Sequence, residues 1–188
     1  MHRSAHQTSV TQLLRRAWYG ASIRAFLETA TDSIVGQLAT HSEFALLPTQ
    51  RDAWLDQIQF LKTSLSGIDG AIYLEFNIPR MGRRIDAVLL IGPVVFVAEF
   101  KVGGDAFERA AVDQVWEYAL DLKNFHLASH TAPIVPLLVA TKATKAGAYQ
   151  LRAAPDAVYW PLMVPPDQFR EIIDAVLGLI GGSPLDAD

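Results

Sequence analysis

The spacing of apolar residues divides the chain into a helical first third and a strand-rich remainder. Over residues 8–40 apolar side chains recur at intervals of three or four, which predicts short amphipathic helices with a break near Thr31-Asp32. A further helix is predicted over residues 52–65, after Pro48 and before Gly67. We therefore expect a helical extension over residues 1–66 that packs on a core.

After Gly70 the pattern changes to alternating or continuous apolar runs, which predict strands. These runs cover residues 71–79, 85–91 and 94–102, with a tight turn at Gly92-Pro93. Asp105, with Glu108 three residues later, has the form of a capping box and predicts a helix that ends near residue 125.

The last part of the chain predicts two more strands and a helix. The strands are expected over residues 134–141 and 157–160, and the helix begins at Pro165-Pro166-Asp167 and ends before Gly181. This order predicts an α/β core over residues 67–182, in three layers with a mixed central sheet flanked by helices, followed by a polar tail over residues 183–188.

Composition restricts the class of protein further. The chain has 188 residues, of which 51% are hydrophobic, so it can form one compact domain. Sixteen Lys and Arg against twenty Asp and Glu exclude a globally basic nucleic-acid binder but not a local basic patch. The absence of cysteine excludes disulfides, thiol nucleophiles and cysteine zinc sites. The longest apolar run, residues 87–98, is too short to span a bilayer, so we expect a cytoplasmic protein without a membrane span.

Three charged residues stand in the apolar hairpin. Glu99 and Lys101 are two residues apart on one strand and therefore share a face. A turn centred on Gly92-Pro93 pairs Ile91 with Val94, and the same register places Asp86 opposite Glu99. The two carboxylates and the ammonium group are thus expected to converge in an otherwise apolar sheet.

Two carboxylates held this close repel each other unless a cation lies between them. Mg²⁺, or Mn²⁺ in its place, suits the pair, because Mg²⁺ binds oxygen ligands and needs only one or two carboxylates besides water. A metal in this position would activate water and stabilise charge on a phosphoryl group. The alternative is a simple ion pair between Glu99 and Lys101 on the strand face, with Asp86 as a polar residue near the turn.

The following helix carries Gln114 and Tyr118, which are four residues apart and share a helical face. Because the helix directly follows the strand of Glu99, this face can lie across the same site and contact a phosphate or sugar. The alternative is a core helix with Tyr118 packed inside.

These residues resemble a known family. IDAVLL and VVFVAEFKV, followed by DQVWEYALDL, are similar to the PD-(D/E)xK nuclease superfamily, in the branch whose helix carries Q-x-x-x-Y. EFNIPRMGRRIDAVLLIGPVVFVAEFKVG further resembles the nuclease-like domain that precedes a P-loop, helicase-like ATPase in a group of bacterial proteins. The segments WYGASIRAFLETATDSIVGQLA and QRDAWLDQIQFLKTSL resemble the helical lead-in of that domain. The resemblance covers most of residues 18–142.

The resemblance implies a restriction-endonuclease-like fold and a metal-dependent nuclease. It assigns metal ligation to Asp86 and Glu99, with the backbone carbonyl of Phe100 as a further ligand, and the role of catalytic lysine to Lys101. Gln114 and Tyr118 are implied as substrate contacts.

The chain departs from the family pattern at two points. Ile85 stands where the motif name implies proline, which is common variation. Many members also carry an acid on the helix before the hairpin, and here the candidates for a third acid are Asp56 and Gln57 on the helix and Glu75 on the first strand. Without that acid, one-metal chemistry or weak activity is expected.

A basic turn precedes the strand of Asp86. Its arginines, Arg80, Arg83 and Arg84, are expected to bind backbone phosphates, and the alternative is a solvated turn. Lys142 and Lys145 either extend this patch or are plain surface charges.

His126 and His130 have the i, i+4 spacing of a helical metal site, but no acidic or cysteine partner stands at ligand spacing. A structural role is therefore favoured for this pair of histidines.

The sequence thus predicts Mg²⁺- or Mn²⁺-dependent hydrolysis of phosphodiester bonds, in DNA in preference to RNA, with an ATPase or helicase domain as a partner in the same chain or another. The rival interpretation is an inactive nuclease fold that binds nucleic acid or docks a partner ATPase.

Overall fold

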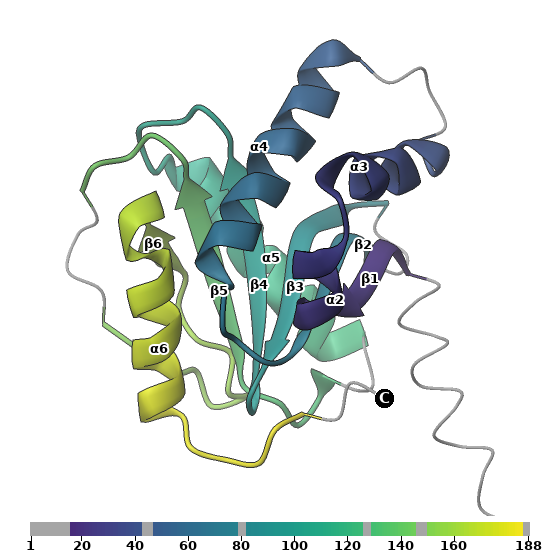
Figure 1. Ribbon diagram of the computed structural model, residues 1–188. Helices are drawn as coiled ribbons and strands as arrows, with labels where there is room; N and C mark the ends of the chain where they lie inside the picture. The colour runs from purple at the N-terminus through teal and green to yellow at the C-terminus, as the bar shows by residue number, and fades with distance from the viewer. Residues whose placement is uncertain (1–15, 43–46, 79–81, 126–128, 146–149, 186–188) are drawn as a thin grey trace, which may run out of the picture.

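The computed structural model describes residues 16–42, 47–78, 82–125, 129–145 and 150–185, and these form a six-stranded mixed sheet between two layers of helices (Figure 1). The strands are β1 (Ala17–Ser22), β2 (Ala71–Asn77), β3 (Arg84–Ile91), β4 (Val94–Lys101), β5 (Ile134–Ala140) and β6 (Leu162–Val164). The helices are α2 (Ile23–Glu28), α3 (Thr31–Thr40), α4 (Pro48–Ser64), α5 (Arg109–Phe125) and α6 (Phe169–Leu179), and the 3-10 turn η2 (Pro166–Gln168) precedes α6.

The strands lie in the sheet in the order in which they occur in the chain. The pairs β1–β2, β2–β3 and β3–β4 are antiparallel, whereas β4–β5 and β5–β6 are parallel. A parallel connection needs a crossover, and α5 supplies it between β4 and β5, behind the sheet in the view of Figure 1.

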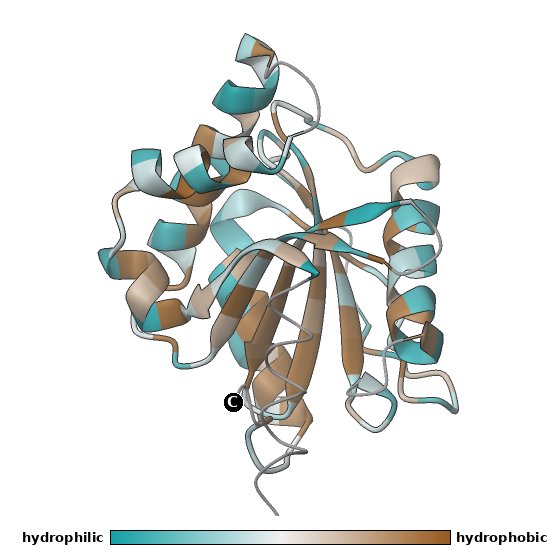
Figure 2. Ribbon diagram, turned by 90° about the vertical axis from the view of Figure 1, so that its right-hand side faces the viewer, coloured by the Kyte–Doolittle hydropathy of each residue, from teal (hydrophilic) through white to brown (hydrophobic). Residues whose placement is uncertain are grey.

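Each face of the sheet carries its own hydrophobic core. Helices α2, α3, α4 and α6 pack on one face through residues such as Phe26, Ile58 and Phe169. Helix α5 packs on the other face through Val115 and Leu122. Figure 2 shows the layers from the side, with brown strands between helices whose outer surfaces are largely teal. The three-layer α/β prediction is confirmed. In the described residues, no helix has both the length and the apolar character needed to cross a membrane.

The prediction of an all-helical segment over residues 8–40 is wrong at Ala17–Ser22, which forms the edge strand β1. Residues 8–15 lie outside the described part. Ala17 and Tyr19 are buried and alternate with the half-buried Trp18, and β1 pairs with β2 in an antiparallel register. A short apolar run does not distinguish a strand from a helix by itself, and here pairing with β2 decides the outcome. The described part of residues 1–66 therefore adds a strand to the sheet as well as three helices.

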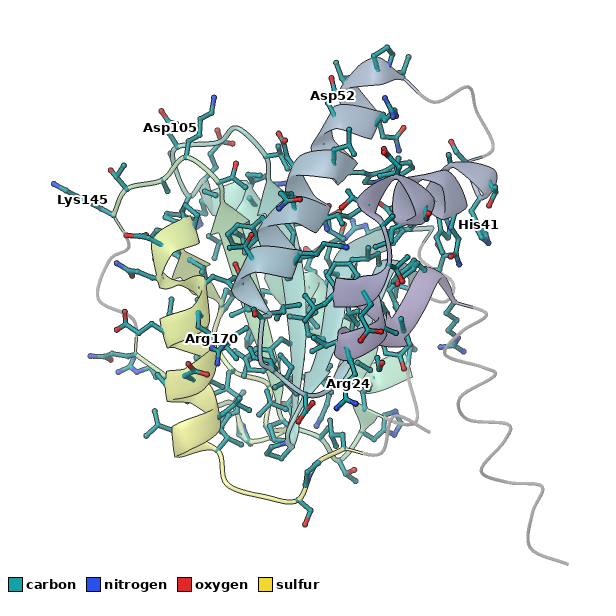
Figure 3. The ribbon with its side chains drawn as sticks, viewed as in Figure 1. Arg24, His41, Asp52, Asp105, Lys145 and Arg170 are labelled. Carbon is teal, nitrogen blue, oxygen red and sulfur yellow. The ribbon has the colours of Figure 1, made fainter. Side chains whose placement is uncertain are left out.

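The predicted capping box is also wrong, because α5 begins at Arg109 rather than after Asp105. The segment after β4 is bound to the end of β5 instead: Gly103 N–H donates to Thr141 Oγ1 at 2.8 Å, and Lys142 N–H donates to the Gly104 carbonyl at 2.8 Å. These bonds hold the segment in a turn, and Asp105 points outward into solvent (Figure 3).

The expected strand over residues 157–160 is replaced by two isolated bridges, at Val158 and Tyr159, and the sixth strand is Leu162–Val164. Ala157 has a φ of 61°, which turns the backbone out of an extended run. The predicted helices over residues 52–65 and after Pro165-Pro166 are confirmed, the first beginning earlier, at Pro48.

Gly70, immediately before β2, is expected to tolerate no side chain. Its φ is 150°, its carbonyl accepts from Ile23 N–H at 2.8 Å, and an added Cβ would overlap the Leu90 carbonyl oxygen. Gly70→Ala should therefore lower the free energy of unfolding by at least about 2 kcal/mol, measured by urea denaturation. Gly36→Ala is the matched control, because Gly36 lies in α3 with open space around it, and there alanine should be neutral or stabilising. Equal effects of the two substitutions would contradict the prediction.

Candidate active site

The hairpin of β3 and β4 has the register expected from the sequence. The pairing runs from Ile91 with Val94 to Ala87 with Ala98, where the backbone ladder ends one step before Asp86 and Glu99. At this step a side chain joins the ladder: Asp86 Oδ2 accepts a hydrogen bond of 2.8 Å from the backbone N–H of Phe100. The bond fixes the Asp86 carboxylate at the open end of the hairpin.

At the level of Asp86, the regular alternation of side chains between the two faces of the sheet is interrupted. On β2, Tyr73 and Phe76 both belong to the core beneath α5, although residues an odd number apart should point to opposite faces. Between them Glu75 has a φ of 52°, which is rare for a residue other than glycine. Such backbone strain clusters at functional sites, and here it brings a third carboxylate to the same part of the sheet.

Glu99 and Lys101 form an ion pair at the end of β4. Lys101 Nζ donates to Glu99 Oε1 at 3.0 Å and lies 3.4 Å from Gln114 Oε1 on α5. Glu99 is only 6% exposed, and its second oxygen, Oε2, is buried without a hydrogen-bond partner in the described part of the chain. A buried carboxylate oxygen normally has a partner, and here either a proton held between Glu99 and Asp86 or a bound cation can supply it.

Helix α5 supplies a polar pair to the same site, and the predicted shared face of Gln114 and Tyr118 is confirmed. Gln114 Nε2 donates to Tyr118 Oη at 2.7 Å, while Gln114 Oε1 faces Lys101. Burial raises the pKa of the Tyr118 phenol, and the Gln114 hydrogen bond opposes that effect. Tyr118 is therefore a neutral group at physiological pH.

The two central carboxyls resist ionisation. Burial raises the pKa of Asp86 well above its usual value, and the charge of Glu99 raises it further, against the opposing Phe100 N–H bond. Burial likewise raises the pKa of Glu99, while the hydrogen bond and charge of Lys101 and a hydrogen bond with Asp86 oppose this. Loss of water is thus the leading cause at both carboxyls, and at Asp86 the charge of the neighbouring carboxylate adds to it.

A cavity of about 610 Å³ opens over these residues. Its volume is within the range of small-molecule and cofactor sites. It is lined from α4, β2, β3, β4 and α5, and all of Asp86, Glu99, Phe100, Lys101, Gln114 and Tyr118 border it. The structure therefore brings together the predicted catalytic and metal-site residues and the polar pair of α5.

Among the three candidates for the position of a further acid, Glu75 and the amide Gln57 border the cavity, whereas Asp56 is exposed and does not. Glu75 is already engaged, because Oε1 accepts from Trp54 Nε1 at 2.8 Å and Oε2 accepts from Arg84 Nε at 2.7 Å. Within the described ranges, no three His, Cys, Asp or Glu side chains form a group suited to holding a metal. The available carboxylate ligands are thus Asp86 and Glu99.

The arginines of the basic turn are partly engaged as well. Arg83 forms an ion pair with Glu117 at 2.6 Å, and Arg84 forms the ion pair with Glu75 while its guanidinium lies 4.2 Å from the centroid of the Trp18 ring. Arg80 lies outside the described residues.

The lysines and histidines considered in the sequence lie apart from this site or outside the description. Lys145 projects into solvent on the side of the molecule away from His41 (Figure 3), and neither it nor Lys142 lines the cavity. His126 falls outside the described residues, while His130 Nε2 lies 3.3 Å from the Asn124 carbonyl near the end of α5.

Sequence reasoning named Gln57 of α4 as a candidate but missed the contribution of Gln50 and Trp54 to the site. Gln50, Trp54 and Gln57 all border the cavity. Their spacing of four and three residues was a usable signal, because it places two glutamines and a tryptophan on one helical face.

No family model matches the chain, and no curated protein matches it. Among solved structures, the chain is similar to one described as the crystal structure of protein VC1899 from Vibrio cholerae, with a TM-score of 0.35 and 9% sequence identity. The match covers 92% of this chain and 49% of that protein, so the chain spans about half of its length. A similarity at this level supports no inference about function.

Proposed function

We propose that the protein is a cytoplasmic, metal-dependent nuclease of the PD-(D/E)xK type that hydrolyses phosphodiester bonds in DNA, in preference to RNA. The observation that carries the proposal is the unpartnered, buried Oε2 of Glu99, beside Asp86 and Lys101 in one cavity. The resemblance of residues 18–142 to that superfamily supports the same assignment.

The donor set suits a hard divalent cation. Asp86 and Glu99 offer carboxylate oxygens, and the backbone carbonyl of Phe100 is the further ligand that the resemblance implies. Mg²⁺ accepts such a set because it needs few protein ligands and keeps several waters. When bound, Mg²⁺ or Mn²⁺ would lower the pKa of a water molecule and offset charge on the phosphate.

The remaining residues hold the substrate and manage its charge. Lys101 has three N–H donors, and two of them are taken up by hydrogen bonds to Glu99 and Gln114. The third can donate to a phosphate oxygen, where the ammonium group stabilises the negative charge that grows during hydrolysis. Tyr118 orients Gln114 and so fixes the position of the lysine.

A second candidate function is a non-catalytic module that binds nucleic acid or docks a partner ATPase. The observation that favours it is the engagement of Arg83 and Arg84 by Glu117 and Glu75, which leaves only Asp86 and Glu99, among the described carboxylates of the site, as ligands for a metal. Such a module would bind nucleic acid with an affinity that falls as salt rises, but it would not cut.

Metal dependence tests the proposal. The purified chain should nick plasmid DNA or shorten single-stranded DNA when Mn²⁺ or Mg²⁺ is present and stop when the metal is chelated by EDTA. Glu99→Gln, which keeps the shape of the side chain but removes its charge, should weaken Mn²⁺ binding by at least the roughly 10–100-fold that loss of an outer-shell partner costs, measured by calorimetry or by the paramagnetic resonance of free Mn²⁺. Salt-dependent DNA binding without any metal-dependent cutting would favour the non-catalytic module instead.

A further inference from the structure

A second cavity lies next to the first, on the side of the edge strand β1. Its volume is about 490 Å³, and Trp18, His41, Asn77 and Arg84 are among the residues that line it. Gln50, Gly82 and Arg84 border both cavities, so the two are adjacent.

Three planar groups gather in this second cavity. The rings of Trp18 and His41 are nearly parallel, with centroids 6.0 Å apart and an interplanar angle of 20°, and the Arg84 guanidinium lies 4.2 Å from the Trp18 centroid. Aromatic rings and guanidinium planes are the surfaces on which proteins stack unpaired bases.

Contacts with neighbouring residues hold Trp18, His41 and Arg84 in place. Trp18 packs edge-on against Trp54, at 6.2 Å and 79° between the rings, and His41 Nδ1 donates to the Gln37 carbonyl at 3.0 Å. Arg84 is fixed by its bond to Glu75. A ligand would therefore meet a largely ordered surface, which lowers the entropic cost of binding.

The polar character of the second cavity differs from that of the first. Among the described residues that line it, none is acidic, while Asn77 and Gln50 carry amide groups that can donate to and accept from a base edge. The first cavity, by contrast, contains three carboxylates. The second cavity thus suits a base and its phosphate, and the first suits a metal.

We propose that this second cavity binds an unpaired nucleotide adjacent to the bond that is cut, with its base extending the stack of Arg84, Trp18 and His41 on the exposed His41 ring. The preferred substrate is then single-stranded nucleic acid or a frayed end, because a base inside a duplex is already stacked on its neighbours. This inference rests on the proposed function, since it places the base beside the cleavage site.

Binding of a labelled single-stranded oligodeoxynucleotide of about 12 residues, measured by fluorescence anisotropy without metal, tests the proposal. Trp18→Ala should weaken binding about tenfold, which is within the range for loss of one stacked base, and Trp18→Phe should retain most of the affinity. Trp160→Ala is the matched control, because Trp160 is 54% exposed and stacks on Trp116, away from both cavities.

An abasic oligonucleotide of the same length separates stacking from a general loss of structure. Wild type and Trp18→Ala should bind it equally, and the thermal unfolding midpoint of each variant reports whether it folds. An equal loss of affinity for the abasic and the normal strand would overturn the proposal, as would a duplex that binds better than the single strand. His41→Ala, at an exposed position, gives a second test that does not depend on the packing of Trp18.

The two proposals fail in different ways. Cleavage that requires metal but is indifferent to Trp18→Ala, both in rate and in binding, would overturn the stacking site and leave the nuclease. Binding that depends on Trp18 without any metal-dependent cleavage would support the stacking site and overturn the nuclease.

Discussion

Lys101→Ala is expected to lower the rate of Mn²⁺-dependent DNA cleavage by about 10²–10⁴-fold without weakening the binding of the metal. The ammonium group lies 3.0 Å from Glu99 Oε1 and lines the cavity, so it is placed to act on the substrate rather than to ligate a cation. Its removal also withdraws a positive charge from the two carboxylates, which favours a divalent cation at that place. Single-turnover cleavage and Mn²⁺ titration of the same preparation measure the two effects.

Asp86→Ala should differ from Lys101→Ala in one respect, because it should lose metal binding together with cleavage. Lys145→Ala is the control, since Lys145 is an exposed lysine on another part of the surface (Figure 3), and its cleavage should remain at the wild-type rate. Cleavage that persists in both Asp86→Ala and Lys101→Ala would refute the catalytic assignment.

Asp86→Asn is expected to stabilise the metal-free protein at neutral pH. Asparagine can still accept the Phe100 N–H bond through its amide oxygen, but it carries no charge to repel Glu99. We expect a gain of about 1–2 kcal/mol in the free energy of unfolding, as for other substitutions that relieve a strained functional site, and a rise of about 3–6 °C in the unfolding midpoint.

The sign of the pH dependence follows from the raised pKa of Asp86. Burial and the Glu99 charge raise the pKa in the folded state above the value in the unfolded chain. The folded state therefore binds this proton more tightly, and the stability that the protonated carboxyl contributes is lost as pH rises through the folded pKa. The stability difference between Asp86→Asn and wild type should be near zero below the ordinary carboxyl range and grow as pH increases.

Metal ions should make wild type more stable than Asp86→Asn and so reverse their order of stability. Mg²⁺ binds the folded state and should stabilise wild type by about 2.7 kcal/mol at a hundred times its dissociation constant, whereas Asp86→Asn should gain little. Asp52→Asn, an exposed change on α4 (Figure 3), controls for the loss of one carboxylate. A stability difference between Asp86→Asn and wild type that did not vary with pH would contradict this account.

Much of the fold follows from local sequence signals. The Gly92-Pro93 turn fixes a register that can be counted from the sequence, and the observed pairing of Ile91 with Val94 agrees with it. The edge strand β1 could not be predicted in this way, because its six residues form a strand only by pairing with β2, about fifty positions later. The prediction of where α5 starts failed for a related reason, since Gly103 and Gly104 form hydrogen bonds with the segment after β5.

The candidate site likewise has one part that the sequence predicts and another that only the folded structure reveals. Asp86, Glu99 and Lys101 were found because they lie on one hairpin, where spacing alone determines proximity. The ion pair of Arg84 with Glu75 depends instead on the positive φ of Glu75, and no residue type in the sequence predicts that conformation. The stack of Trp18 on His41 joins β1 to the end of α3, and only tertiary packing brings these two rings together.

The proposed site combines residues from two distant parts of the chain, the hairpin of β3 and β4 and the edge strand β1. The carboxylates and the lysine come from residues 86–101, so short-range contacts assemble them, and such contacts form fast. Trp18 reaches the site only when the beginning of the chain docks on β2. In the proposed nuclease, changes in this first strand would therefore alter which nucleic acid is held while the carboxylates and the lysine are preserved, so that substrate choice and hydrolysis would evolve separately within one small domain.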